Sequence, residues 1–238
     1  MGLKRFRLKV KETVATVIAE GEFFPIAERE VEKQREILER YISKNPDFLN
    51  SLKPIFVSDN SPEIVKRMAK ASFRAGVGPM ASVAGAISYF AVREMVKEGA
   101  KHVIFENGGD IAMFISEPVI IGIYSGEKVK NLGLRFKPKN SIIGVCTSSG
   151  KMGHSLSFGK ADSVTVISED PVLADAVATA LCNSIDEEDP DKIERAINRF
   201  LIHGIEGVIV VIGNLVGLGG NLPEFIETPI PYELITTW

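Results

Sequence analysis

The most informative segment of the chain reads Asp170-Pro171-Val172-Leu173-Ala174-Asp175-Ala176-Val177-Ala178-Thr179-Ala180-Leu181-Cys182-Asn183. It predicts a helix, because Asp170 can cap the first backbone amides and proline is tolerated at the first helical position. After Pro171, only Asp175 and Thr179 are polar until Asn183. A helix that is apolar nearly all round is typical of a protein interior, so we expect this one to be buried.

The two polar side chains inside this helix are four residues apart, which places the Asp175 carboxyl group and the Thr179 hydroxyl on one face, about one turn apart. A buried carboxylate must find a partner or change its protonation state. Two hard oxygen ligands suit Mg²⁺, which completes its shell with water and substrate phosphates. We therefore predict Asp175 and Thr179 as metal ligands. The alternative is an Asp bonded to a neighbouring backbone amide and a Thr bonded to its own preceding turn.

Upstream of this helix, residues 71–98 predict another helix, whose segment 81–88 carries almost only small side chains. Its backbone can therefore be approached closely. Four turn-like segments, 76–79, 107–110, 147–150 and 153–155, are rich in glycine or hydroxyl groups, so their backbone amides can surround a phosphate. These segments predict a nucleotide or another phosphorylated ligand. The candidate binding residues are Gly78, Ser82, Asn107, Gly108, Gly109, Asp110, Thr147, Ser148, Ser149 and Gly150.

Each turn also has a purely structural interpretation. Asn-Gly between two strands is the commonest hairpin signal, so Asn107-Gly108 taken alone indicates a hairpin. Two other motifs fail on inspection. Residues 144–151 have one residue too many for a phosphate loop and Met152 where that motif needs Ser or Thr. Residues 153–157 lack the final glycine and the following helix of a hydrolase nucleophile elbow.

The order of predicted elements indicates the fold class. An N-terminal hairpin over 5–20 precedes three helices, at 26–42, from Ser61-Pro62-Glu63 onward, and at 71–98. Strands are mostly consecutive and helices are grouped, which favours an α+β fold with a largely antiparallel sheet flanked by helices. We expect one compact domain over residues 1–238, with an N-terminal region at residues 1–70, a motif-bearing region at residues 76–183 and a C-terminal region at residues 184–238. The remaining predicted elements are strands at 102–106, 111–115, 119–124, 132–136, 141–146, 163–168, 207–212 and 214–218, a helix at 190–201, and an extended tail with Pro223, Pro229 and Pro231.

Composition narrows the function classes. The 238 residues are 45% hydrophobic, and 28 Lys and Arg against 31 Asp and Glu give a net charge of −3. This charge provides no polycationic surface for nucleic acid, so we expect no nucleic-acid partner. The longest nearly uncharged stretch, 80–92, is shorter than the roughly 20 apolar residues a bilayer requires. Two cysteines, Cys146 and Cys182, and the absence of a signal-peptide pattern lead us to expect a cytoplasmic protein without a membrane span.

Taken in chain order, the motifs resemble those of the ApbE family of flavin transferases. The matching segments are Val83-Ala84-Gly85-Ala86, Gly108-Gly109-Asp110, Cys146-Thr147-Ser148-Ser149-Gly150, His154, Ser163-Val164-Thr165-Val166 and, most specifically, Ala174-Asp175-Ala176-Val177-Ala178-Thr179-Ala180-Leu181. The resemblance covers roughly residues 76 to 183. It implies an ApbE-like fold and binding of FAD with Mg²⁺, the metal being held by Asp175 and Thr179.

The resemblance also implies a reaction, in which FMN is moved from FAD onto a Thr or Ser hydroxyl of an acceptor protein and AMP is released. His154 would assist the proton transfer as the catalytic residue, and Gly109 and Asp110 would line the nucleotide pocket. The chain departs from the family in having Ala84 in place of a lysine expected near the phosphates. It is identified as a short branch of the superfamily.

Two alternatives stay open at this point: a flavin-binding or sensing module without turnover, and an enzyme that uses the same pocket for a non-flavin metabolite. The expected partners are a small nucleotide ligand and, for a transferase, an acceptor protein. A homodimer is also plausible, because several apolar strand-like segments need cover.

Overall fold

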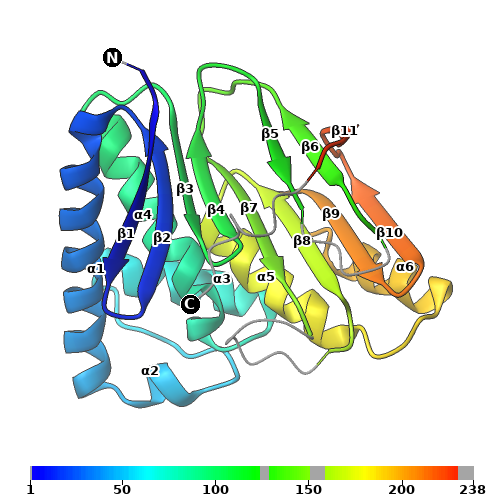
Figure 1. Ribbon diagram of the computed structural model, residues 1–238. Coiled ribbons are helices and arrows are strands. Elements are labelled where there is room, and N and C mark those ends of the chain that lie inside the picture. The colour runs from blue at the N-terminus through cyan, green and yellow to red at the C-terminus, as the bar shows by residue number, and fades with distance from the viewer. Residues whose placement is uncertain (1, 124–128, 151–158, 230–238) are drawn as a thin grey trace.

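The structure, a computed structural model, describes residues 2–123, 129–150 and 159–229. The described residues form three layers: helices, a large antiparallel sheet and a small antiparallel sheet (Figure 1). This arrangement confirms the predicted α+β class. The large sheet has the strand order β1 (Lys4–Val10), β2 (Thr13–Ala19), β3 (Val103–Asn107), β4 (Asp110–Phe114), β7 (Ile143–Ser148), β8 (Ser163–Ser168), β9 (Ile205–Ile212) and β10 (Leu215–Gly220).

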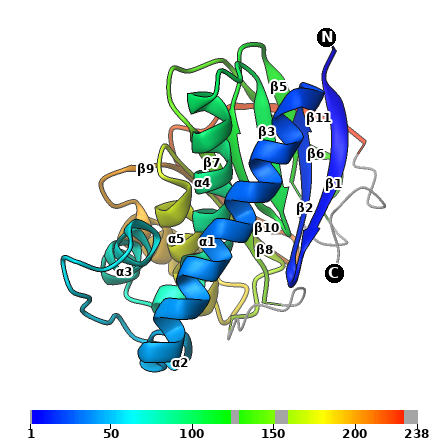
Figure 2. The ribbon, with the colours of Figure 1, turned by 90° about the vertical axis from the view of Figure 1, so that its left-hand side faces the viewer.

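The small sheet has the order β11 (Glu224–Glu227), β6 (Leu132–Phe136) and β5 (Val119–Gly122). It encloses a second apolar core with one face of the large sheet, to which Met113, Leu134 and Val145 contribute. The helices cover the other face and form the larger core (Figures 1 and 2). They are α1 (Phe24–Lys44), α2 (Asp47–Asn50), α3 (Glu63–Ala75), α4 (Val83–Lys97), α5 (Pro171–Ser184) and α6 (Pro190–Phe200).

Helix α5 is the predicted helix at 170–183, and it lies at the centre of the helical layer. Every residue from Pro171 to Cys182 is buried, as its composition predicts. It packs against α3, α4, β7 and β8. Glycine makes the contact with β7 possible, because a Cβ at Gly144 would lie only 2.6 Å from the Cα of Pro171. The start of α5 therefore lies directly against the start of β7.

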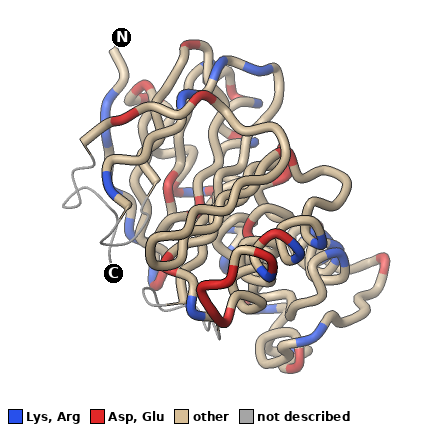
Figure 3. The backbone as a smooth tube through the Cα atoms, turned by 90° about the vertical axis from the view of Figure 1, so that its right-hand side faces the viewer, with Lys and Arg blue, Asp and Glu red and all other residues tan. Residues whose placement is uncertain are grey.

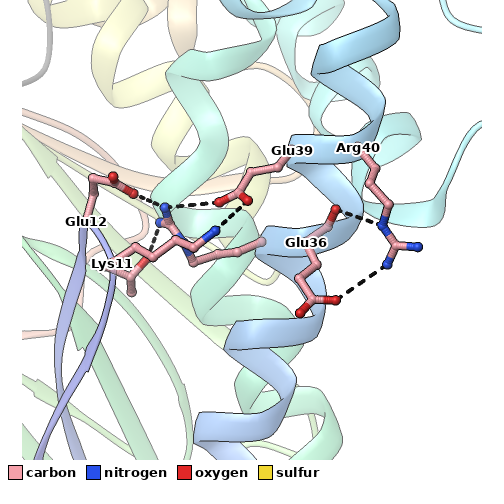
Figure 4. A network of polar contacts seen from close by, with 7 residues as sticks. Lys11, Glu12, Glu36, Glu39 and Arg40 are labelled. Atoms are coloured by element: carbon pink, nitrogen blue, oxygen red, sulfur yellow. Dashed lines mark hydrogen bonds and ion pairs between the residues drawn. The ribbon is translucent and has the colours of Figure 1, made fainter.

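Helix α1 lies across the outer side of α4 and beside the β1–β2 hairpin (Figure 2). Ion pairs fasten it to the hairpin turn (Figure 4): Lys11 Nζ lies 2.6 Å from Glu39 Oε2, and Arg35 contacts Glu12. Arg35 also donates to Thr13 Oγ1 over 2.8 Å. This network belongs to the scaffold and lies away from the residues predicted for the site.

The helix predicted over 71–98 is wrong as a single element. Helix α3 ends at Ala75, where Gly76 has a φ of 77°, and a 3₁₀ turn at Pro79–Ser82 precedes α4. A left-handed residue ends a helix because its amide closes the last turn, and Pro79 has no amide to continue it. The chain therefore bends beside α5 at the small residues of segment 81–88.

The structure corrects two further details. The sequence predicts Ser61 as the capping residue of α3 and Pro62 as its first helical residue, but the helix begins at Glu63, with Pro62 in the N-cap position and no side-chain cap. Within the expected extended tail, β11 pairs with β6, so this segment belongs to a sheet. The pairing joins residues about 90 positions apart, which local sequence does not reveal.

Within the described ranges of the chain, no single helix has the length and apolarity to cross a membrane. Helix α3 and the segment Pro79–Lys97, which are bent by 103° relative to each other, reach that length and apolarity only when they are taken together. On the face turned to the viewer in Figure 3, basic and acidic segments are interspersed. No field of one sign covers that face, in agreement with the small net charge.

Candidate functional site

A cavity of about 720 Å³ lies where α5, the bend between α3 and α4, and the ends of β3, β4 and β7 meet. Most of the predicted site residues line it. They are Gly78, Asn107, Gly108, Asp110, Thr147, Ser148, Ser149, Asp175 and Thr179. Segments that lie up to about 100 residues apart in the sequence therefore share one wall.

Helix α5 begins as predicted and presents Asp175 and Thr179 to this cavity. The Asp170 carboxylate accepts from the amides of Val172 and Leu173, and Pro171 occupies the first turn. Asp175 and Thr179 are 7% and 5% exposed, and both lie on the cavity wall. The two polar side chains are thus buried in an apolar helix without being sealed in its packing.

A backbone amide holds the Asp175 carboxylate, because the Gly85 N–H donates to Asp175 Oδ2 over 2.8 Å. Helix α4 comes this close only because residue 85 is glycine: a Cβ there would lie 2.4 Å from Pro171 O and 2.8 Å from Asp175 Cβ. Burial raises the pKa of Asp175 to about 7, although the amides of Gly85 and Ala84 act to lower it. The predicted close approach to the small-residue segment is confirmed here.

A second carboxyl group, Asp110, lies near the first. Burial raises the pKa of Asp110 well above its ordinary value, the negative charge of Asp175 raises it further, and the thiol of Cys146 partly offsets the effect. Its side chain stays half-buried on the cavity wall. Each carboxylate disfavours ionisation of the other, and a cation bound between them would favour the ionised form of both.

The hydroxyl of Thr179 lies 3.5 Å from the carbonyl oxygen of Ala81, which is at the outer limit of a hydrogen bond. The carbonyl adds a third oxygen to those of Asp175 and Thr179. Among the residues that the structure describes, no cluster of three or more His, Cys, Asp or Glu forms a metal site. A metal in this cavity would therefore depend on a hydroxyl and a carbonyl oxygen besides carboxylates.

The turn at 107–110 is a hairpin and also lines the cavity. Gly108 and Gly109 have φ values of 65° and 97°, which is typical of a two-residue hairpin turn between paired strands. Asn107 is 3% exposed and donates to Ala84 O over 3.4 Å, and its side-chain oxygen has no hydrogen-bond partner among the described residues. The two interpretations of this turn are thus compatible.

Three of the predicted binding residues lie behind the wall. The hydroxyl of Ser82 is buried and donates to Pro79 O, and the amide of Gly109 donates to Glu106 Oε1. The amide of Gly150 donates to Ala161 O. These three groups form hydrogen bonds to other residues of the chain, and their residues do not line the cavity. His154, together with the rest of 151–158, lies outside the described residues.

Residues that the sequence did not indicate complete the wall. The loop after α2 contributes Ser51 and Leu52, and it reaches the cavity because Gly78 packs directly on the Ser51 carbonyl. Arg199 and Phe200 come from the end of α6. No local signal marks these positions, since each reaches the site through a contact with a distant element.

Comparison with known proteins shows which family the chain resembles over most of its length. It matches the model of the family described as AbpE bacteria over residues 1–202. It is 44% identical over 232 residues to a UPF0280 protein of Methanosarcina barkeri, which covers 96% of this chain and 91% of that protein. It is 42% identical over 241 residues to a UPF0280 protein of Archaeoglobus fulgidus, which covers 98% and 99%.

Solved structures support the same placement. The apo form of the flavinyl transferase ApbE of Pseudomonas stutzeri is similar with a TM-score of 0.57 at 15% identity, covering 98% of this chain and 96% of that chain. The ApbE protein of Thermotoga maritima gives 0.57 at 14% identity, covering 98% and 99%. The fold is therefore ApbE-like, as the resemblance implies. With its sequence match and this fold together, the chain belongs to the family described as AbpE bacteria.

Proposed function

We propose that the cavity binds a flavin nucleotide, or a related ligand with a pyrophosphate group, together with Mg²⁺, and that it supports transfer of the FMN half of FAD to a protein hydroxyl. One observation carries this proposal. Asp175 and Thr179, one turn apart in an apolar helix, open into the same cavity as the turns at 107–110 and 147–149. The similar ApbE structures, one of them named a flavinyl transferase, give the fold for it.

The residues present fit Mg²⁺. The Asp175 carboxylate, the Thr179 hydroxyl and the Ala81 carbonyl supply hard oxygens of the kind Mg²⁺ prefers, and only a few protein oxygens are needed because water and phosphates fill the rest of the shell. A cation there would also favour the charged form of Asp175, whose pKa burial raises to about 7.

The cavity also fits a nucleotide. Its volume of about 720 Å³ lies in the range usual for small-molecule and cofactor sites. Val77, Met80 and Val83 provide apolar surface for a ring, while the polar groups gather at the ends of β3, β4 and β7. This separation suits a ligand with an aromatic moiety and a polar phosphate chain.

In the proposed reaction the acceptor hydroxyl oxygen bonds to the phosphorus of the FMN half, the bond to AMP breaks, and AMP leaves with the bonding electron pair. When bound, Mg²⁺ would neutralise charge on the pyrophosphate. Asp175 and Thr179 would fix the position of the phosphates, and the walls from α3 and α4 would exclude water. The hydroxyl must lose a proton, and His154 stays the predicted acceptor on the resemblance alone.

The test compares Asp175→Asn with Asp191→Asn, an exposed control of the same chemistry on α6. Thermal stability is measured with FAD, with and without Mg²⁺, and AMP release is followed by chromatography. We expect Mg²⁺-dependent stabilisation and AMP release in the unaltered chain and in Asp191→Asn, and neither in Asp175→Asn. If Asp175→Asn kept the full response to Mg²⁺, the metal role would be wrong.

A flavin-binding module without turnover is the second candidate, and Ala84 favours it. This residue lines the cavity at the position where the resemblance implies a lysine, so the cation that the resemblance leads us to expect beside the phosphates is missing. Such a module would retain intact FAD with Mg²⁺ and release no AMP in the presence of any acceptor. Incubation of the purified chain with FAD, followed by mass spectrometry of the bound flavin, separates the two candidates.

A further inference from the structure

Arg199 is the only Lys or Arg among the described residues that line the cavity, and neither the sequence motifs nor the resemblance points to it. It lies in the last turn of α6, outside the motif-bearing region of the chain. The same described lining contains two carboxyl groups, Asp110 and Asp175. The ionisable side chains of the described wall are therefore acidic near β4 and α5 and basic only at the end of α6.

The setting of Arg199 leaves its guanidinium available to a ligand. Its side chain is exposed. Among the described residues the guanidinium has no hydrogen bond or ion pair, and it makes a cation–π contact with the ring of Phe200, with Cζ 5.5 Å from the ring centroid. Phe200 is buried in the main core, so the ring beside the guanidinium is fixed in place. By contrast, Arg67 on α3 and Arg93 on α4 are both paired with Glu63.

A ligand with a pyrophosphate group brings negative charge into a cavity that already holds two carboxyl groups. A divalent cation at Asp175 and Thr179 would offset this charge only at that end of the ligand. Ala84, which lines the same wall, supplies no charge. The remaining phosphate charge thus needs a cation from another element, and α6 is the described element that brings one to the wall.

We propose that Arg199 binds the phosphate groups of the ligand and makes the cavity selective for phosphorylated compounds. The inference rests on the proposed function, since it concerns the same ligand and names the group that recognises it. A guanidinium presents paired N–H donors that match two phosphate oxygens, which favours arginine over lysine in such a role. The phosphate selectivity of the cavity would then come from α6, and the ring of the ligand would lie against the apolar residues of the α3–α4 bend.

The structural alternative is that Arg199 stabilises only its own helix. A cation in the last turn interacts favourably with the C-terminal end of the helix dipole. That role would lower the stability of the ligand-free chain on substitution and would leave the relative affinities of different ligands unchanged. The two roles are therefore separated by comparing ligands with and without phosphate.

The experiment measures binding of FAD, riboflavin and inorganic pyrophosphate in the presence of Mg²⁺, by flavin fluorescence and calorimetry. The variants are Arg199→Ala, Arg199→Gln and Arg199→Lys, and the control is Arg195→Ala, an exposed arginine of α6 that does not line the cavity. We expect Arg199→Ala to weaken FAD and pyrophosphate binding by about 10- to 100-fold, the usual range for a lost charge-assisted hydrogen bond. Riboflavin binding should change by less than about twofold, a difference too small to indicate a lost contact. Arg199→Lys should be intermediate, and Arg195→Ala should bind like the unaltered chain.

Unchanged FAD and pyrophosphate binding in Arg199→Ala and Arg199→Gln would overturn the proposal, and so would equal weakening of FAD and riboflavin. If the unaltered chain binds pyrophosphate in an Arg199-dependent way but binds no flavin, the flavin proposal fails and the role of Arg199 stands. If it binds neither, both fail. Arg199→Gln keeps most of the side-chain length, so it tests the charge even if Arg199→Ala does not fold.

Discussion

Replacing Gly85 by alanine will weaken the fold and the proposed metal site together, because both depend on the close approach of α4 to α5. The added Cβ would lie 2.4 Å from Pro171 O and 2.8 Å from Asp175 Cβ. Since non-bonded carbon–oxygen contacts are about 3.3 Å or longer, α4 must move back by about 1 Å. The bond from the Gly85 N–H to Asp175, now 2.8 Å, would then be stretched beyond a useful length.

The size of the effect follows from three contributions. Forcing a methyl group into a packed contact costs about 1–3 kcal/mol, and losing a buried hydrogen bond to a charged group costs about 1.5–3 kcal/mol. Alanine returns about 1 kcal/mol as a better helix former than glycine. One displacement relieves the clash and breaks the bond, so the two costs do not add fully. We expect a net loss of about 2–3 kcal/mol, or a Tm lower by about 4–12 °C for a chain of this size.

The assay is thermal unfolding of Gly85→Ala with and without Mg²⁺, beside Gly21→Ala. A Cβ at Gly21 makes only an ordinary contact, 3.8 Å from the side chain of Lys4, so that control should lie within about 0.5 kcal/mol of the unaltered chain. We also expect Gly85→Ala to lose much of its response to Mg²⁺, because the amide that supports the Asp175 carboxylate has moved. A Gly85→Ala chain as stable and as responsive as Gly21→Ala would refute the reasoning.

Three further outcomes are expected. Burial raises the pKa of Asp175 from 3.8 to about 7, so the folded state holds that proton more tightly. Without metal, the contribution of Asp175 to stability should therefore be lost as pH rises from about 4 to about 7. Urea titrations of Asp175→Asn should give a flatter profile, and identical profiles would contradict the assignment. Gly78→Ala places a Cβ 1.8 Å from the Ser51 carbonyl and should cost about 2 kcal/mol or more in urea unfolding while weakening ligand binding; full stability would show that the loop after α2 moves freely. Arg35→Ala loses the ion pair with Glu12 and should cost about 1 kcal/mol, less in 1 M salt, with ligand binding unchanged; a loss of binding would mean that the network reaches the site.

The sequence predicts α5 well because its signals are local. Asp170 and Pro171 mark its start, and its apolar composition requires burial whichever elements cover it. Strand β8 coincides with the predicted segment 163–168 for the same kind of reason. The sequence could also place Asp175 and Thr179 on one face, since that follows from helical spacing alone.

The distant contacts of the site were not predictable in the same way. The proximity of Asp110 to Asp175 depends on how the hairpin at β3 and β4 lies against α5, and no local pattern encodes it. The carbonyl of Ala81 carries no side-chain signal at all. Arg199 reaches the cavity only because α6 packs against α5. From its sequence alone, a charged helix such as α6 is expected to lie at the surface with its charged side chains in solvent.

The break between α3 and α4 shows how local and distant effects combine. Gly76 and Pro79 are visible in the sequence as helix breakers, yet the small residues that follow them favour one continuous helix. Gly76 and Pro79 end α3, and the close packing of Gly78 on the Ser51 carbonyl holds the bend against the loop after α2. The bend in turn places Ala81 and Gly85 beside α5, so a feature that looks like an interruption positions the two backbone groups that contact the polar side chains of that helix.

Because Asp175 is buried, its protonation state would depend on whether a metal ion and a charged ligand are bound in the cavity. A carboxyl group with a pKa of about 7 is only partly ionised at neutral pH, so a cation that binds it must displace a proton. Burial, and after it the negative charge of Asp175, raises the pKa of the neighbouring Asp110, and a cation between the backbone bends and α5 would weaken the second effect. A phosphorylated ligand that arrives with its own divalent cation would bring the positive charge that favours the ionised carboxylates, and these carboxylates would in turn help to hold the cation. Such a cavity would bind the metal and the ligand more tightly together than either alone, and this coupling follows from placing two carboxyl groups beside the hydroxyl of Thr179 and opposite the single cation, Arg199, of the described wall.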